Sequence, residues 1–165
     1  MEPVRNDTTA DRRTAVELAK RLLVDSIWRT AKIEVDGVTF PDTQEIFDGR
    51  APEGMSVDDI VTVNNIKRAW RFLLDNIDYP VDWQYIREYN RIIGEGLVRD
   101  AGRLREYGVR IGGTGWVPEI PTVESSQERV RGILEESEGE DTAMLLFGAV
   151  TRGQWFSDGN KRTPL

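Results

Sequence analysis

Apolar residues recur every three or four positions through most of the chain, which is the spacing of one face of an amphipathic α-helix. Polar segments that contain capping residues, glycine or proline separate these stretches. We therefore predict helices over residues 9–33, 40–48, 57–77, 83–97 and 122–137, and a last helix that starts at residue 142. The predicted fold class is mainly α.

Two of these helices carry local start signals. Ser56 precedes the third helix, and Asp58 and Asp59 lie in its first turn, where carboxylates interact favourably with the helix dipole. Asp82 stands in the same capping position before the fourth helix. Side chains of this kind accept hydrogen bonds from the free N–H groups of a first turn, so both starts are predicted from the residues themselves.

The most apolar run of the chain, residues 143–150, lies near its C-terminus. Its apolar residues cover nearly every side of a helix, which indicates burial all round. We therefore predict that this last helix is the central one. It would deliver Arg152 and Gln154 to the loop that follows.

Residues 99–121 do not follow helical spacing. Residues 109–111 and 116–118 are short β-like runs on either side of Gly112-Gly113-Thr114-Gly115, which predicts a β-hairpin. A glycine-rich turn can also bind phosphate, but no helix follows this one to supply an N-terminal dipole.

Length and composition narrow the class of protein. A chain of 165 residues suits one domain with its own core, predicted for residues 9–165 after a flexible tail at residues 1–8. The absence of cysteine and histidine excludes disulfides and argues against a zinc site. A net charge of −7 argues against nucleic-acid binding. No stretch resembles a membrane span or a signal peptide, so we expect a cytoplasmic, bacterial protein.

Candidate chemistry gathers just after the last predicted helix. Asp158 and Gly159 suit a tight turn, and a helix that starts at Asn160 would leave backbone N–H groups free to bind phosphate. Lys161 and Arg162 add positive charge and donors, and Asp158 is a natural ligand for a phosphate-bound Mg²⁺ ion. The same residues are also compatible with an ordinary surface turn that precedes a solvated basic end.

The pattern of this stretch as a whole resembles the signature of the Fic/Doc (Fido) family, His-x-Phe-x-Asp/Glu-Gly-Asn-Gly/Lys-Arg. The matching residues are Phe156, Asp158, Gly159, Asn160, Lys161 and Arg162. Gln154 stands at the position of the family's catalytic His. The resemblance implies a Fic-type helical bundle with a short β-hairpin flap. It also implies a further C-terminal helix, which we expect to be missing here because only five residues follow Asn160.

The resemblance implies an activity as well. Fic enzymes use ATP and Mg²⁺ to transfer AMP to a hydroxyl of a target protein, and the His accepts the proton of that hydroxyl. By this resemblance Asp158 would hold the metal, Gly159 and Asn160 would contact the phosphates, and Arg162 would neutralise their charge. Lys161 replaces the commoner Gly, as in the Doc-like branch, where phosphate transfer is known.

Two other segments gain a role from the resemblance. Thr30 and Glu34 fit the spacing of the family's inhibitory helix, Ser/Thr-x-x-x-Glu. In the family the inhibitory Glu pairs with a second Arg, and Leu165 occupies the position of that Arg in this chain. Arg162 would therefore have to be the partner of Glu34. The flap that docks the target by strand addition would be formed by Val109, Arg110, Ile111, Gly112 and Gly113.

Gln154 leaves three interpretations open, because a neutral amide can orient a hydroxyl but cannot accept its proton. The first is a transferase of impaired activity. The second is a non-catalytic module that binds a nucleotide or a protein partner, for example as a regulator of an active relative. Association into a homo-oligomer is a separate expectation. The third is a structural remnant without a site.

Overall fold

The structure is a computed structural model that describes residues 8–164. Within these residues the chain forms seven α-helices and no β-strand, so the mainly α fold class is confirmed. No described helix has the length and apolar composition needed to cross a membrane. Residues 1–7 of the predicted tail lie outside the described residues, and Thr8, its last residue, is the first residue of α1. The helices are α1 (Thr8–Arg21), α2 (Leu23–Ala31), α3 (Phe40–Phe47), α4 (Val57–Asp75), α5 (Trp83–Gly94), α6 (Val123–Glu136) and α7 (Gly139–Gly153).

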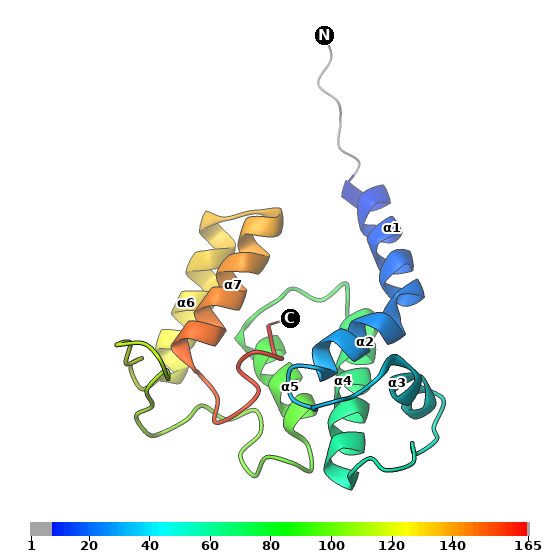
Figure 1. The fold of residues 1–165 in the computed structure, drawn as a ribbon. Coiled ribbons are helices and arrows are strands. Elements are labelled where there is room, and N and C mark those ends of the chain that lie inside the picture. The colour runs from blue at the N-terminus through cyan, green and yellow to red at the C-terminus, as the bar shows by residue number, and fades with distance from the viewer. Residues whose placement is uncertain (1–7, 165) are drawn as a thin grey trace.

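The helices form two groups that meet at α5 (Figure 1). In the first group α2, α3, α4 and α5 pack on one another, and α1 projects away from α2. In the second group α6 and α7 lie side by side, and α6 contacts α5. The segment that follows α7 runs back between the two groups, so its residues can contact both.

The core of the first group lies among α2, α3 and α4. Each aliphatic side chain that is fully buried contributes about 1.5–3 kcal/mol of hydrophobic stabilisation, so these residues hold the group together. The buried residues of this core are Ile27, Ala31, Val35, Val38, Ile46, Val63 and Ile66. A smaller cluster joins α4 to α5 and consists of Ala69, Tyr89, Ile92 and Ile93.

A separate core joins α5 to the second group and to the segment after α7. Trp83, the first residue of α5, stacks on Phe156 with ring centroids 5.8 Å apart. Trp155 meets the edge of Trp83 at the same centroid distance. Val130 of α6 and Val150 of α7 are buried in this cluster. The two aromatic residues after α7 therefore fix the start of the C-terminal loop.

The predicted helix starts at Ser56 and Asp82 are confirmed. Ser56 Oγ accepts a hydrogen bond from Asp59 N, and Asp82 Oδ1 accepts one from Tyr85 N. Such a cap contributes about 1 kcal/mol to stability. These bonds set where α4 and α5 begin.

The single helix predicted over residues 9–33 is two helices. The break falls at Leu22, whose φ of −96° and ψ of 9° leave the helical region. Ile27 and Ala31 of α2 are buried against α3 and α4, whereas the described side chains of α1 are largely exposed. The break lets α2 pack on the first group while α1 leaves it, and no glycine or proline marks it in the sequence.

The prediction that the last helix is central was wrong. Helix α7 starts at Gly139 and packs on α6, and Val150 is its fully buried residue. Met144 and Leu145 are 68% and 45% exposed. An apolar sequence indicates that a helix is buried, but it does not show which elements cover it. Here α6 packs on one side of α7 and leaves the other side largely open.

We expect this open face of α7 to bind a hydrophobic dye in the native protein, because Met144 and Leu145 are exposed and adjacent. The double variant Met144→Gln and Leu145→Gln should lose most of the dye fluorescence, since glutamine preserves helix propensity and removes apolar area. Val57→Gln is the matched control, because Val57 is 75% exposed on a different helix. Equal fluorescence from all three proteins would contradict the assignment, and light scattering on the same samples reports self-association.

The predicted β-hairpin was also wrong. Residues 109–118 contain no strand, and two backbone hydrogen bonds close the turn, from Ile111 N to Trp116 O at 3.3 Å and from Thr114 N to Ile111 O at 3.2 Å. Proline at 118 and 121 removes donors that a longer ladder would need, and three glycines favour a turn over extended chain. The residues predicted to form the flap lie in this turn and its approach: Val109, Arg110, Ile111, Gly112 and Gly113.

Candidate functional site

The candidate site is the loop after α7, which we call the C-terminal loop (residues 154–164). It begins with Gln154 in the left-handed region, at φ 48° and ψ 54°, where the residue caps α7. Gly159 also has a positive φ, of 76°. A Cβ atom at Gly159 would lie 2.9 Å from Asn90 Nδ2, so both the backbone and the close packing require glycine there.

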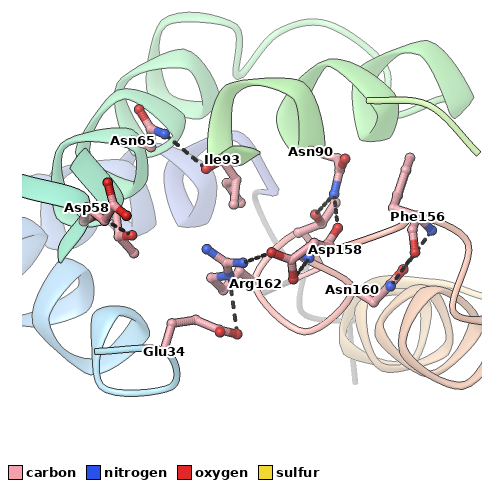
Figure 2. Close-up of polar contacts among 12 residues, drawn as sticks. Glu34, Asp58, Asn65, Asn90, Ile93, Phe156, Asp158, Asn160 and Arg162 are labelled. Carbon is pink, nitrogen blue, oxygen red and sulfur yellow. Dashed lines mark hydrogen bonds and ion pairs between the residues drawn. The ribbon is translucent and has the colours of Figure 1, made fainter. Parts of the chain in front are cut away.

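Asn160 holds the shape of this loop. Its Oδ1 accepts a hydrogen bond from Phe156 N at 2.9 Å, and its Nδ2 donates to Phe156 O at 2.8 Å (Figure 2). Thr151 Oγ1 donates to the backbone oxygen of Asn160 at 3.3 Å. Asn160 is buried, and its amide therefore serves the loop itself rather than a ligand.

Arg162 links the loop to the other end of the described chain. Its Nη2 donates to Asp158 Oδ2 at 3.1 Å, and its Nε lies 3.4 Å from Glu34 Oε1 (Figure 2). The Arg162 side chain is 5% exposed, yet its Nε has no hydrogen-bond acceptor among the described residues. A buried donor without a hydrogen-bond acceptor is costly, so this Nε could bind an anion that displaces the nearby Glu34 carboxylate.

Three backbone N–H groups add to that capacity. The N–H groups of Asn160, Lys161 and Arg162 have no acceptor in the part of the chain that the structure describes. Thr163 N bonds to Gly159 O at 2.8 Å, so these residues form one helix-like turn. The free N–H groups of such a turn favour negative charge, as the sequence predicts for a phosphate.

Asn90 of α5 fixes the position of the C-terminal loop. Its Nδ2 donates to Asp158 O and to Thr163 Oγ1, both at 2.9 Å (Figure 2). Its Oδ1 accepts from Gly102 N at 2.8 Å. The side chain is buried with all of these bonds made, so it ties the C-terminal loop and the loop after α5 to one point of the helix.

Arg105 fixes the start of the loop. This buried residue donates to four backbone carbonyls. Two belong to the end of α7, at Gln154 (2.5 Å) and Gly153 (3.2 Å), and the others are Tyr107 O and Glu119 O, both at 2.5 Å. Burial lowers the pKa of the Arg105 guanidinium, which stays protonated near neutral pH. A cation at the end of a helix also interacts favourably with its dipole.

The side chain of Gln154 is engaged with the protein. Its Nε2 donates to Thr151 O at 2.6 Å, and its Oε1 lies 3.4 Å from Asn160 Nδ2. The Gln154 amide therefore braces α7 against the C-terminal loop. It is half-buried, and it has no titratable proton to exchange.

Asp158 is the one carboxylate of the C-terminal loop that could bind a metal ion arriving with a phosphate. The described residues hold no cluster of three or more acidic, histidine or cysteine side chains. Mg²⁺ commonly binds through one or two carboxylates together with substrate phosphates and water. Asp158 is 52% exposed, with Oδ1 accepting from Gly159 N and Oδ2 paired with Arg162. One carboxylate oxygen would have to leave its present partner to bind the ion.

The other predicted site residues are distributed as follows. Glu34 meets Arg162, as the inhibitory interpretation required. Thr30 is directed back into α2, where its Oγ1 donates to Ser26 O at 2.9 Å. Lys161 is exposed and makes no hydrogen bond or ion pair among the described residues. The flap residues make no polar contact with the C-terminal loop in the described structure.

Sequence reasoning missed Asn90 and Arg105. Asn90 had a signal, because it is a polar residue on the same helix face as Ile86, Tyr89 and Ile93. Arg105 had none, since it lies in an irregular segment among other charged residues. No protein-family model matches this chain, and no curated protein shows significant sequence similarity to it.

Proposed function

We propose that the C-terminal loop binds the phosphates of ATP with Mg²⁺ and that the chain is a Fic-like protein with impaired AMP transfer. The observation that carries the proposal is the buried Arg162, which has an unsatisfied Nε beside three free backbone N–H groups. Charge-assisted bonds of this kind are the strong ones in phosphate recognition. One acidic residue in the loop, Asp158, completes the donor set for a magnesium–nucleotide.

The transfer step is proposed from the resemblance of the loop to the Fic signature. Residues 159–162 would hold the phosphates, and Asp158 would hold the metal, which would neutralise charge on them. Gln154 would orient the hydroxyl of an unidentified target protein without accepting its proton. Loss of a general base commonly lowers a rate by about 10²–10⁴, so the proposed activity is weak.

A non-catalytic nucleotide-binding or protein-binding module is the second candidate. It is favoured by the Gln154 side chain, whose amide donates to Thr151 O and approaches Asn160 instead of standing free. A Doc-like phosphotransferase is a third, and it rests on Lys161, which is exposed beside the free N–H groups. All three share the phosphate site and differ in what happens to the bound nucleotide.

Glu34 would restrain this site. Its carboxylate faces Arg162 Nε at 3.4 Å, which is where a phosphate oxygen would compete for the same guanidinium. Glu34 is 35% exposed, so it can turn toward solvent at modest cost. We propose that Glu34 lowers nucleotide affinity in the resting protein.

Calorimetric titration of ATP with Mg²⁺ tests these assignments. Arg162→Ala should weaken binding by about 1.5–3 kcal/mol, or about 10- to 150-fold, because it removes hydrogen bonds to a charged group. Glu34→Gln should tighten binding, because it removes the competing charge and keeps the volume. Arg110→Ala is the control, since Arg110 is exposed and lies outside the loop. Equal binding by wild type and Arg162→Ala, or no binding by any variant, would contradict the proposed function.

A further inference from the structure

A second basic site lies beside α5, outside the C-terminal loop. It is a cleft of about 660 Å³ between α5 and the loop that follows it, and none of its lining residues belongs to the C-terminal loop. We call it the arginine cleft. Its charged lining residues are Arg87, Glu88, Arg91, Arg99, Asp100 and Arg103.

The charge of the arginine cleft is the reverse of that of the whole chain. Four arginines face two carboxylates there, in a protein whose net charge is −7. Glu88 is paired with Arg91, because both of its carboxylate oxygens accept hydrogen bonds from that residue. Asp100 lies 4.0 Å from Arg103, at the limit of an ion pair. Arg91 also pairs with Glu95, 3.7 Å away, so the positive charge without a carboxylate partner is that of Arg87 and Arg99.

Two of the arginines have free donors. Arg99 makes no hydrogen bond or ion pair within the described residues. Arg87 uses its Nε to donate to Gly102 O at 3.0 Å, which leaves its two terminal nitrogens unbonded in the described structure. An anion in the cleft would supply acceptors for these donors.

The cleft is held in shape without a ligand. Gly102 accepts from Arg87 through its oxygen and donates to Asn90 Oδ1 through its nitrogen, so its peptide groups are fixed to α5 at two points. A Cβ atom on Gly102 would lie 2.7 Å from the Cβ atom of Arg91. The loop can approach the helix this closely because residue 102 is glycine.

We propose that the arginine cleft binds a small molecule that carries two or more phosphate groups. The planar fork of arginine matches phosphate oxygens in pairs, which a lysine ammonium does not. The volume lies within the range of about 300–1,000 Å³ that is usual for small-molecule sites. The acidic surface elsewhere disfavours nucleic acid and other long polyanions, which would have to pass over repelling charge.

The test is titration of inorganic pyrophosphate into the Arg162→Ala protein, which removes the main side-chain donor of the other phosphate site. We expect one pyrophosphate to bind per chain. Adding Arg99→Gln and Arg103→Gln should lower the affinity for pyrophosphate at least about tenfold, since each arginine supplies charge-assisted hydrogen bonds. Both side chains are exposed, so the variants should fold normally. A control that adds Arg110→Gln and Arg129→Gln changes the net charge equally and should bind as before.

Three outcomes would contradict the proposal that the arginine cleft binds a phosphate-bearing ligand. They are no pyrophosphate binding in the Arg162→Ala protein, the same affinity after the Arg99 and Arg103 changes, or an equal loss in the Arg110 and Arg129 control. The C-terminal loop is tested separately, by ATP binding with and without Arg162 to a chain that carries Arg99→Gln and Arg103→Gln, so that ATP cannot bind in the arginine cleft. Failure of either site is therefore distinguishable from failure of the other.

Discussion

Replacing Gln154 with histidine should increase labelling from ATP that carries a radioactive α-phosphate by at least about tenfold over wild type, a conservative part of the general-base range. An imidazole with an ordinary pKa of about 6.5 can accept the proton of an attacking hydroxyl near neutral pH. Histidine is among the residues that tolerate a left-handed backbone, so the φ of 48° at this position is no obstacle. Labelling of the chain itself or of added proteins is read after electrophoresis.

The control for this gain is Asp158→Ala in the Gln154→His protein. It should abolish the labelling, because Asp158 is the acidic ligand proposed for the metal. Labelling of wild type as strong as that of the variant would show that Gln154 is no handicap. Absence of label in both, despite measured ATP binding, would reject transfer and favour the non-catalytic module. Label carried from the γ-phosphate instead would favour the Doc-like phosphotransferase.

Replacing Arg105 with methionine should lower the free energy of unfolding by about 3 kcal/mol. The change keeps a long apolar stem but removes every donor to four backbone carbonyls, which remain partly buried without partners. Each unsatisfied buried acceptor costs about 1–3 kcal/mol, and local relaxation toward water recovers part of the total. Urea denaturation followed by circular dichroism measures the loss.

Arg110→Met is the matched control for that experiment, because Arg110 lies in the same segment but is exposed. It should change stability by less than about 0.5 kcal/mol. The loss of stability in Arg105→Lys should lie between those of Arg105→Met and Arg110→Met, since one ammonium can reach fewer of the four carbonyls than a guanidinium. Equal stability of the Arg105→Met and Arg110→Met proteins would show that the four bonds contribute nothing net.

The helices could be predicted where their signals are local. Ser56 and Asp82 cap the helices that follow them because the capping bond spans three residues. The break at Leu22 and the open face of α7 could not be predicted, since both depend on which helices are neighbours. The absence of the predicted hairpin could not be foreseen for the same reason. Strands form only where two backbone segments pair, and residues 109–118 do not form such a ladder.

The candidate site was predictable in part. The residue types from Asp158 to Arg162 suit a phosphate turn but also fit an ordinary surface turn, and the resemblance of the whole pattern to the Fic signature is what favours the phosphate site. The approach of Glu34 to Arg162 followed from the family resemblance and not from the residues around either one. Arg105 could not be found at all, because nothing in its local sequence distinguishes a buried arginine from an exposed one.

The long reach of the contacts made by Asn90 has a kinetic consequence. This side chain binds residues 68 and 73 positions later in the chain, whereas α2, α3, α4 and α5 meet neighbours that short loops connect. Closing a longer loop costs more chain entropy, and contacts distant in sequence slow folding. The helical scaffold can therefore form before the site does. In the folded protein the C-terminal loop can open without unfolding the helices on which it rests, so activity and helicity can be lost at different temperatures.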